Sequence, residues 1–300
     1  MSKSANYAIC VACGTQFDIP VDDAKDCRIC DDPRQFVPPT GQEWTSLAKL
    51  REQGFKNVWT KDEVDDRVWF ITSEPKIGIG QRAMFLQTEH GNILWDLTPF
   101  IDEKLIAEVN SKGGLKAIVI SHPHFYNTHL EWAEALNCPV FISPEDQQWL
   151  CRADSPEKPR RKFITGPIEE IILGVTAIKT GGHFPGSLVL HWDKKLLIAD
   201  SIMIVPWGEK SGIYHINRPP GTISFSFMWS YPNMIPLSPK AIHVIWEAVK
   251  LFDFETMHGG FPGMDVRGSG LKRRLLESMK IWVTSAGYEE TEVLNEEYEG

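Results

Sequence analysis

Histidines gather where an apolar part of the chain ends and a helix is expected to begin. Residues 117–120 form a short uninterrupted apolar run, the pattern of a strand covered on both faces. His122 and His124 follow it two residues apart, so in an extended chain both imidazoles point to the same side and can share one ion. Thr128 and Glu131 have the spacing of a capping box at a helix start. This stretch predicts a metal site; the alternative is histidines whose rings are satisfied by ordinary contacts.

Three later stretches repeat this form, in which a strand end is followed by a side chain that binds metals. His183 lies in the glycine-rich loop 180–187 between two expected strands, and glycines allow the sharp turn that projects a single ligand. Asp200 follows the apolar residues 196–199 directly, and His258 ends a short expected strand before two glycines. Each stretch alone is a weak signal, but together with the first they indicate one site.

The other elements alternate between strands and helices, which places the large region in the α/β class. Strands are expected at residues 66–71, 82–88, 92–97, 117–120, 139–142, 168–173, 175–179, 188–192 and 195–199, and helices around residues 105–109, from 128, from 144, and at 240–250 and 271–285. The order of these elements is strand pairs first, followed by alternating helices and strands.

Four cysteines near the N-terminus form two Cys-x-x-Cys pairs separated by 13 residues: Cys10, Cys13, Cys27 and Cys30. In a reducing compartment this pattern indicates a tetrathiolate metal site rather than disulfides, and structural zinc is the favoured ion. Two redox dithiols are the alternative. The segment also resembles rubredoxin-like and zinc-ribbon knuckles, so iron stays open. We predict a metal knuckle at residues 1–38, a break at residues 38–41, and a large domain at residues 39–300.

The charge balance limits the partners of the protein. The chain has 31 basic and 40 acidic residues in 300, a formal charge of −9, which disfavours a nucleic acid or an anionic membrane as partner. Residues 1–7 carry no apolar core typical of a signal peptide, and no apolar run approaches the length of a membrane span. We therefore expect a cytoplasmic protein that acts on a small molecule.

Residues from about 45 to 290 resemble the metallo-β-lactamase superfamily, whose fold is a four-layer αββα sandwich with metals at one edge of its two sheets. The family signature is His-x-His-x-Asp-His, a histidine in a glycine-rich loop, an aspartate after a strand, and a late histidine. His122 and His124 match the first two ligands, His183 the third, Asp200 the bridging aspartate and His258 the last histidine. The resemblance implies a zinc-dependent enzyme.

The chain departs from this signature at the second metal position. Tyr126 and Asn127 stand where the family has Asp-His, so the resemblance implies one zinc ion held by the three histidines of the first position, with iron as the alternative. Asp200 and His258 are then candidates for fourth ligand, base or proton relay. His129 is an alternative replacement ligand. Tyr126 either donates a hydrogen bond to a developing oxyanion or fills the volume of the second metal.

Residues 205–236 are rich in aromatic residues and broken by Gly and Pro. By analogy with the family they form a lid over the substrate; the alternatives are a contact between copies in a homo-oligomer, or extra core. The function predicted from these observations is hydrolysis of an ester, thioester, lactone or lactam by zinc-bound water. The alternatives are a non-catalytic metal-binding or sensing protein of the same fold, and an iron-ribbon redox protein.

Overall fold

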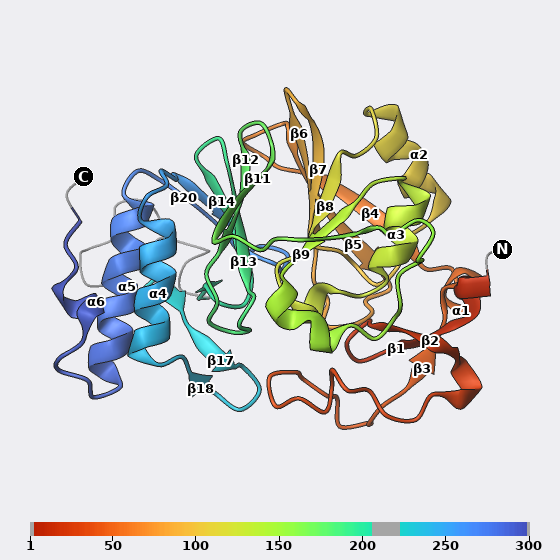
Figure 1. Ribbon diagram of the computed structural model, residues 1–300, viewed down its shortest axis with the longest axis horizontal. Coiled ribbons are helices and arrows are strands. Elements are labelled where there is room, and N and C mark those ends of the chain that lie inside the picture. The colour runs from red at the N-terminus through yellow and green to blue at the C-terminus, as the bar shows by residue number, and fades with distance from the viewer. Residues whose placement is uncertain (1–2, 206–222, 299–300) are drawn as a thin grey trace. The chain divides into compact units, whose positions relative to one another are not determined.

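The computed structural model describes residues 3–205 and 223–298, which divide into two compact units, residues 1–164 and 165–300 (Figure 1). Each unit is built around one large sheet whose strands all come from that unit. Within the described residues, no helix is both long enough and apolar enough to cross a membrane.

The first unit contains a seven-stranded sheet in the order β10-β9-β8-β7-β6-β5-β4. Its strands are β4 (Lys56–Lys61), β5 (Val68–Glu74), β6 (Ala83–Thr88), β7 (Gly91–Trp95), β8 (Ala117–Val119), β9 (Val140–Ile142) and β10 (Arg161–Phe163). The first four are antiparallel, and β7 to β10 are parallel. The interior strand β8 is buried along its whole length, as its unbroken apolar sequence predicts.

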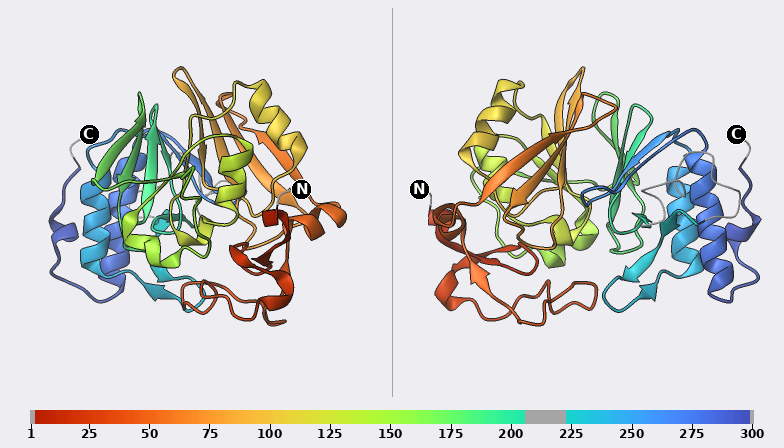
Figure 2. Two further views of the ribbon diagram at one scale, coloured as in Figure 1. Left: turned by 45° about the vertical axis from the view of Figure 1, so that its right-hand side comes forward. Right: turned by 180° about the vertical axis from the view of Figure 1, so that it is seen from behind.

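Helices of the first unit accompany this sheet. They are α1 (Leu47–Glu52), α2 (Glu103–Ser111) and α3 (His129–Ala135), with 3₁₀ turns η3 (Pro123–Phe125) and η4 (Pro144–Trp149). Helices α2 and α3 lie along one face of the sheet in the views of Figures 1 and 2. The helix expected from residue 144 is thus a 3₁₀ turn.

The capping box predicted at the start of α3 is wrong. Thr128 occupies the N-cap position, but its side chain makes no capping hydrogen bond. Its hydroxyl donates instead to the carbonyl of Pro99 at 3.0 Å. Glu131 accepts a hydrogen bond from Arg152 at 2.5 Å. Both side chains are recruited by tertiary partners, which compete with local capping at a buried helix start.

A small sheet in the order β2-β1-β3 holds the N-terminal residues. It is made of β1 (Tyr7–Cys10), β2 (Gln16–Pro20) and β3 (Trp44–Thr45), with 3₁₀ turns at η1 (Lys3–Asn6) and η2 (Val21–Asp23). Strand β3 lies beyond the boundary predicted near residue 38, and it pairs with β1 through Ile9 and Cys10. The boundary itself stays a prediction.

The second unit contains a six-stranded sheet in the order β11-β12-β13-β14-β19-β20. Its elements are β11 (Ile168–Ile172), β12 (Val175–Lys179), β13 (Leu188–Trp192), β14 (Lys195–Leu197), β19 (Thr256–His258) and β20 (Asp265–Arg267), the short strands β15 (Met203–Ile204), β16 (Phe225–Ser226), β17 (Met228–Ser230) and β18 (Ile235–Pro236), and the helices α4 (Pro239–Val249), α5 (Leu271–Ser285) and α6 (Glu292–Asn295). Figure 1 shows α4 and α5 side by side. Ile245 of α4 and Leu275 of α5 belong to one buried core.

The described part of the aromatic segment 205–236 contributes to this core. Phe225 and Phe227 are fully buried among the apolar residues of the second unit. Burial of a phenylalanine stabilises a fold by about 1.5–3 kcal/mol, so these rings serve packing. For these two residues, extra core was the correct alternative. Trp207 and Tyr214, also predicted for the lid, lie outside the described residues.

Candidate metal centre

The first unit places His122 and His124 together at the end of β8. His122 is extended, with φ −168°, and the turn η3 then brings His124 back so that the two ring centroids lie 5.1 Å apart. Both side chains are buried. The predicted extended geometry is therefore corrected to one extended residue followed by a 3₁₀ turn, and the expected pairing of the rings is confirmed.

A chain of hydrogen bonds orients His122. Asp96, directly after β7, accepts from the backbone N–H of Ser121 at 2.7 Å, and the Ser121 hydroxyl is 2.9 Å from Nδ1 of His122. With Nδ1 engaged in this way, Nε2 is the nitrogen placed to bind a metal. Hydrogen bonds of this kind fix the orientation and basicity of metal-binding imidazoles.

His129 is not a replacement ligand. Its Nδ1 lies 2.7 Å from the carbonyl of Tyr126, which can only accept, so Nδ1 carries the proton. Its Nε2 accepts from Nε of Arg161 at 2.9 Å. Burial, and then the nearby Arg161 charge, lower the pKa of His129 to about 3, so the ring is neutral. Both ring nitrogens are occupied by structural hydrogen bonds.

Tyr126 is a buried phenol beside His129, with ring centroids 5.9 Å apart. Burial raises the pKa of Tyr126 well above its usual value of 10, and the negative charge of Asp146 raises it further. The hydroxyl therefore keeps its proton at neutral pH. Both predicted roles, oxyanion donor and space filler, need a protonated phenol, so the choice between them stays a prediction.

The second unit places His183 and Asp200 together. Nδ1 of His183 donates to the carbonyl of Met228 at 3.1 Å, so in the neutral ring Nε2 carries the lone pair. That atom lies 3.8 Å from Oδ2 of Asp200. Two atoms bound at 2.0–2.2 Å to one tetrahedral ion are about 3.4 Å apart. The donor types and their separation fit a shared metal ion.

Close packing explains why a glycine is needed at position 182 of the predicted loop. Its φ is +93°, and a Cβ there would lie 3.0 Å from Oγ of Ser201. The Ser201 hydroxyl donates to the carbonyl of Gly181 at 2.7 Å and accepts from the backbone N–H of His183 at 3.0 Å. The close approach of this serine fixes the backbone that carries the histidine.

His258 ends β19 and is fully buried. Its Nδ1 lies 2.5 Å from Oδ1 of Asp265 on β20, directly opposite in the antiparallel register. A carboxylate at Nδ1 directs Nε2 toward a metal or a substrate and stabilises a transient positive charge on the ring. His258 thus has the partner expected of a metal ligand or proton relay, and its role stays a prediction.

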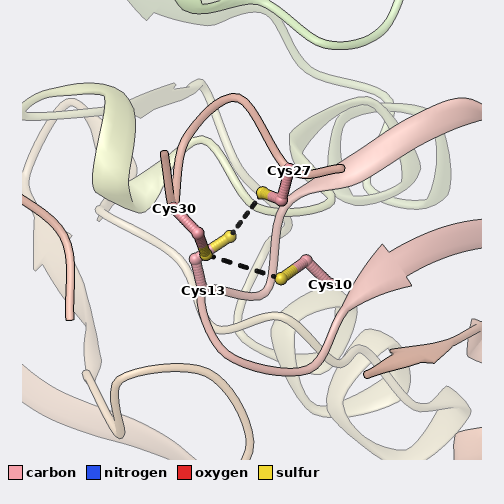
Figure 3. A group of neighbouring side chains, drawn as sticks. All are labelled: Cys10, Cys13, Cys27 and Cys30. Atoms are coloured by element: carbon pink, nitrogen blue, oxygen red, sulfur yellow. Dashed lines mark hydrogen bonds between the residues drawn. The ribbon is translucent and has the colours of Figure 1, made fainter. Parts of the chain in front are cut away.

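The four cysteines are buried and lie together, and Figure 3 shows their sulfur atoms turned toward one another. All four Sγ atoms lie within 4.8 Å of one another, and the pairs Cys10–Cys30 and Cys13–Cys27 are 3.6 Å apart. A disulfide would need about 2.0 Å, whereas two thiolates on one tetrahedral zinc lie about 3.8 Å apart. Hydrogen bonds from the other three thiols lower the pKa of Cys10 well below its usual range. The donor set fits a tetrathiolate metal site.

Comparison with known proteins gives a relative of similar length. The chain is 36% identical over 262 residues to the uncharacterized protein YmaE of Bacillus subtilis (strain 168), and the match covers 85% of this chain and 88% of YmaE. The chain belongs to the YmaE family. No family model matches it.

The fold of this YmaE family member is similar to that of metallo-β-lactamases. A structure of DIM-1 metallo-β-lactamase matches with a TM-score of 0.51 and 12% identity, and a structure of VMB-1 at pH 5.5 with 0.52 and 14%. Each match covers 76% of this chain and 98% of the other. The chain has the metallo-β-lactamase fold, as its strand-end residues and their order predict.

Sequence reasoning missed four residues that support the site in this family member. Asp96 carried a readable signal, because it follows an apolar strand just as Asp200 does. Asp265 could have been placed opposite His258 if residues 259–263 had been interpreted as a hairpin turn. No pattern in the sequence predicted the roles of Arg161 and Tyr231. The Tyr231 hydroxyl donates to the backbone carbonyl of Asp200 at 2.9 Å.

Proposed function

We propose that the protein is a metal-dependent hydrolase that cleaves an ester, thioester, lactone or lactam bond in a small molecule, with one zinc ion bound by His122, His124 and His183. The observation that carries the proposal is the arrangement at His183. Its Nδ1 is committed to the Met228 carbonyl, so the Nε2 lone pair is directed to the side of Asp200, 3.8 Å from its carboxylate. This separation is too long for a hydrogen bond and close to that of two ligands of one ion, which supports the proposal.

A zinc ion held by three imidazoles supplies a bound water with a pKa of about 7 and polarises a carbonyl group. Asp200 serves as fourth ligand or as the base that takes a proton from the attacking water. His258, held at Nδ1 by Asp265, relays a proton through Nε2 to the leaving group. Tyr126 donates to the developing oxyanion.

The first unit favours one ion over two. Where the metallo-β-lactamase signature has two ligands, this chain has Tyr126 and Asn127. His129, the nearest substitute in the sequence, has both ring nitrogens bound by Tyr126 and Arg161. The Arg161 guanidinium also adds a positive charge beside His129, which opposes a second cation there.

The cysteine set holds a second, structural zinc ion in this proposal. Among the described residues, the buried members of the apolar cluster around the thiols, apart from the four cysteines, are Ala12 and Ile29, and of the half-buried residues packed against it only Phe17 lies within residues 1–38. So small a core cannot stabilise the segment, and metal binding supplies the missing free energy. A red, iron-containing segment that is reversibly reduced would instead favour a redox protein.

The test begins with zinc-loaded protein and a panel of aryl esters, thioesters, lactones and lactams. We expect turnover of at least one member, a loss of 100-fold or more on His122→Ala, and no change on His90→Ala, which removes an exposed histidine of the β6–β7 turn. If no member is turned over, or if His122→Ala leaves the rate unchanged, the replaced second metal position favours the non-catalytic metal-binding protein instead.

A further inference from the structure

We propose that Asn127 links the four-cysteine site to the histidine loop, so that metal bound by the cysteines strengthens metal binding by His122 and His124. This inference rests on the proposed function for the identity of the histidine site. It assigns to Asn127, which stands where the family signature has a metal ligand, a positioning role instead.

The cysteine knuckle lies directly against Asn127 at Gly14, the residue after Cys13. Gly14 has φ +81°, and a Cβ there would lie 2.4 Å from Oδ1 of Asn127 and 2.2 Å from Cγ of Pro99. Neither contact is possible for a side chain, so the close approach requires glycine. The Gly14 N–H donates to the carbonyl of Cys10 at 2.7 Å, which closes the knuckle.

Asn127 makes hydrogen bonds both to the cysteine segment and to the histidine loop. Its carbonyl accepts from the backbone N–H of Gln16 on β2 at 3.2 Å, and its Oδ1 accepts from the side chain of Gln81 at 3.0 Å. Its Nδ2 donates to the carbonyl of His124 at 3.4 Å. The Asn127 side chain therefore lies against Gly14 of the cysteine segment and bonds to the backbone of His124, while its backbone carbonyl bonds to the cysteine segment at Gln16.

A second connection runs from the same strand to the helix after the loop. The side chain of Gln16 accepts from Nη1 of Arg152 at 2.6 Å, and the same Nη1 donates to Glu131 of α3 at 2.5 Å. Strand β2 thus bonds directly to the histidine loop at Asn127, and Arg152 connects it to Glu131 in the helix that follows. Both contacts require β2 to stay folded.

The backbone of Asn127 explains how a change at the cysteines is transmitted. Its φ is +40°, a left-handed conformation that asparagine adopts more readily than most non-glycine residues but that its surroundings still help to hold. Loss of the cysteine-bound metal unfolds the knuckle, removes the Gly14 and Gln16 contacts, and lets residue 127 leave this conformation. The carbonyl bond to His124 is then lost, and the two imidazoles lose their mutual geometry.

Coupling between two binding sites of this kind is typically about 5–150-fold in affinity, and it is reciprocal. The test of this coupling is the zinc affinity of the histidine site, measured in the full chain by competition with a chromophoric chelator. The four proteins are wild type, Cys27→Ser, Asn127→Gly and the double variant. Asn127→Gly keeps the left-handed backbone accessible while it removes the side-chain link.

We expect Cys27→Ser to weaken zinc binding at the histidine site by 5-fold or more, and to weaken it less than 3-fold when Asn127→Gly is already present. Asn137→Gly is the matched control, since Asn137 is an exposed asparagine with φ +48° that does not touch the knuckle. Equal effects of Cys27→Ser in both backgrounds, or no effect in either, would overturn the proposal.

Hydrogen exchange provides a measurement that needs neither turnover nor folded cysteine variants. Metal is removed from the cysteines of the wild-type chain with an organomercurial thiol reagent. We expect the amides of residues 122–128 to lose protection while the core of residues 165–300 keeps it. Retained protection at residues 122–128 contradicts the link even if the protein proves to be a hydrolase. Lost protection supports the link even if no substrate is found.

Discussion

The two predicted metal sites are built from opposite kinds of sequence. The cysteine set draws four identical donors from residues 10–30, around a core too small to fold by itself. The histidine set draws mixed donors from strand ends spread between residues 122 and 258. The rings of three of them are held by protein partners, Ser121 for His122, Met228 for His183 and Asp265 for His258. From this difference we expect the local set to depend on its metal for structure, and the set supported by sheets to be preformed and to leave a position for chemistry.

The largest expected effect is the loss of folded structure when metal is removed, which we expect at the cysteine site and not at the histidine site. Cys27→Ala should remove the cysteine-bound ion and the protection of residues 7–30 from hydrogen exchange, because structural zinc contributes about 10–16 kcal/mol of apparent binding free energy in small metal-folded domains. His183→Ala should remove the other ion and leave both sheets protected. Metal analysis and hydrogen exchange check both expectations.

Cys138→Ala is the matched control, because Cys138 is a buried thiol outside the metal-binding group. It should keep both ions. Protection of residues 7–30 in metal-free protein would break the comparison, since the cysteine segment would then be stable by packing alone.

The sequence predicted the parts of both sites that are local in the chain. Cys-x-x-Cys spacing, the strand end before His122 and the glycine loop around His183 each follow from short-range geometry, and the structure confirms these elements. It could not predict the partner of His129, because Arg161 reaches it from a strand 32 residues further on. The capping box failed for the same reason, since tertiary partners engage Thr128 and Glu131.

The next prediction contrasts a structural histidine with those assigned to the metal. The folded pKa of His129 is about 3, below the ordinary 6.5, so the folded state binds fewer protons between these values. The neutral His129 therefore costs no folding free energy above pH 6.5. As the pH falls from 6.5 toward 3, the unfolded state gains a proton that the folded state does not, so the free energy of unfolding decreases. At pH 4.5 the loss should be about 2–3 kcal/mol.

His129→Gln keeps an acceptor for Arg161 but cannot titrate. Urea unfolding at pH 7 and pH 4.5 should therefore show a smaller acid loss in this variant than in the wild type, by about 2–3 kcal/mol. Both proteins contain the same remaining histidines, so their contribution cancels in the difference. An identical acid loss in the two proteins would mean that burial and the Arg161 charge do not hold His129 neutral in the folded state.

A smaller effect should separate chemistry from metal binding within the histidine set. Asp200→Asn keeps the size and most of the hydrogen bonding of the side chain and removes its charge. If Asp200 takes a proton in the reaction, the rate should fall by about 100-fold or more, as is typical for a lost acid or base. Metal content should largely remain, since three imidazoles are left. Loss of the ion together with the rate would assign Asp200 to metal binding instead.

The smallest effect tests whether Tyr126 belongs to the chemistry or to the packing. Tyr126→Phe removes only a hydroxyl, so a space-filling ring should tolerate it, whereas loss of an oxyanion donor should lower kcat, by less than Asp200→Asn does, with metal content unchanged. Burial holds the pKa of this phenol well above 10, so the loss should be the same from pH 6 to pH 9. Tyr288→Phe, at an exposed tyrosine, should have no effect. An unchanged kcat for Tyr126→Phe would show that the ring fills the second metal position, and a loss that varies across this pH range would show that the phenol ionises during the reaction.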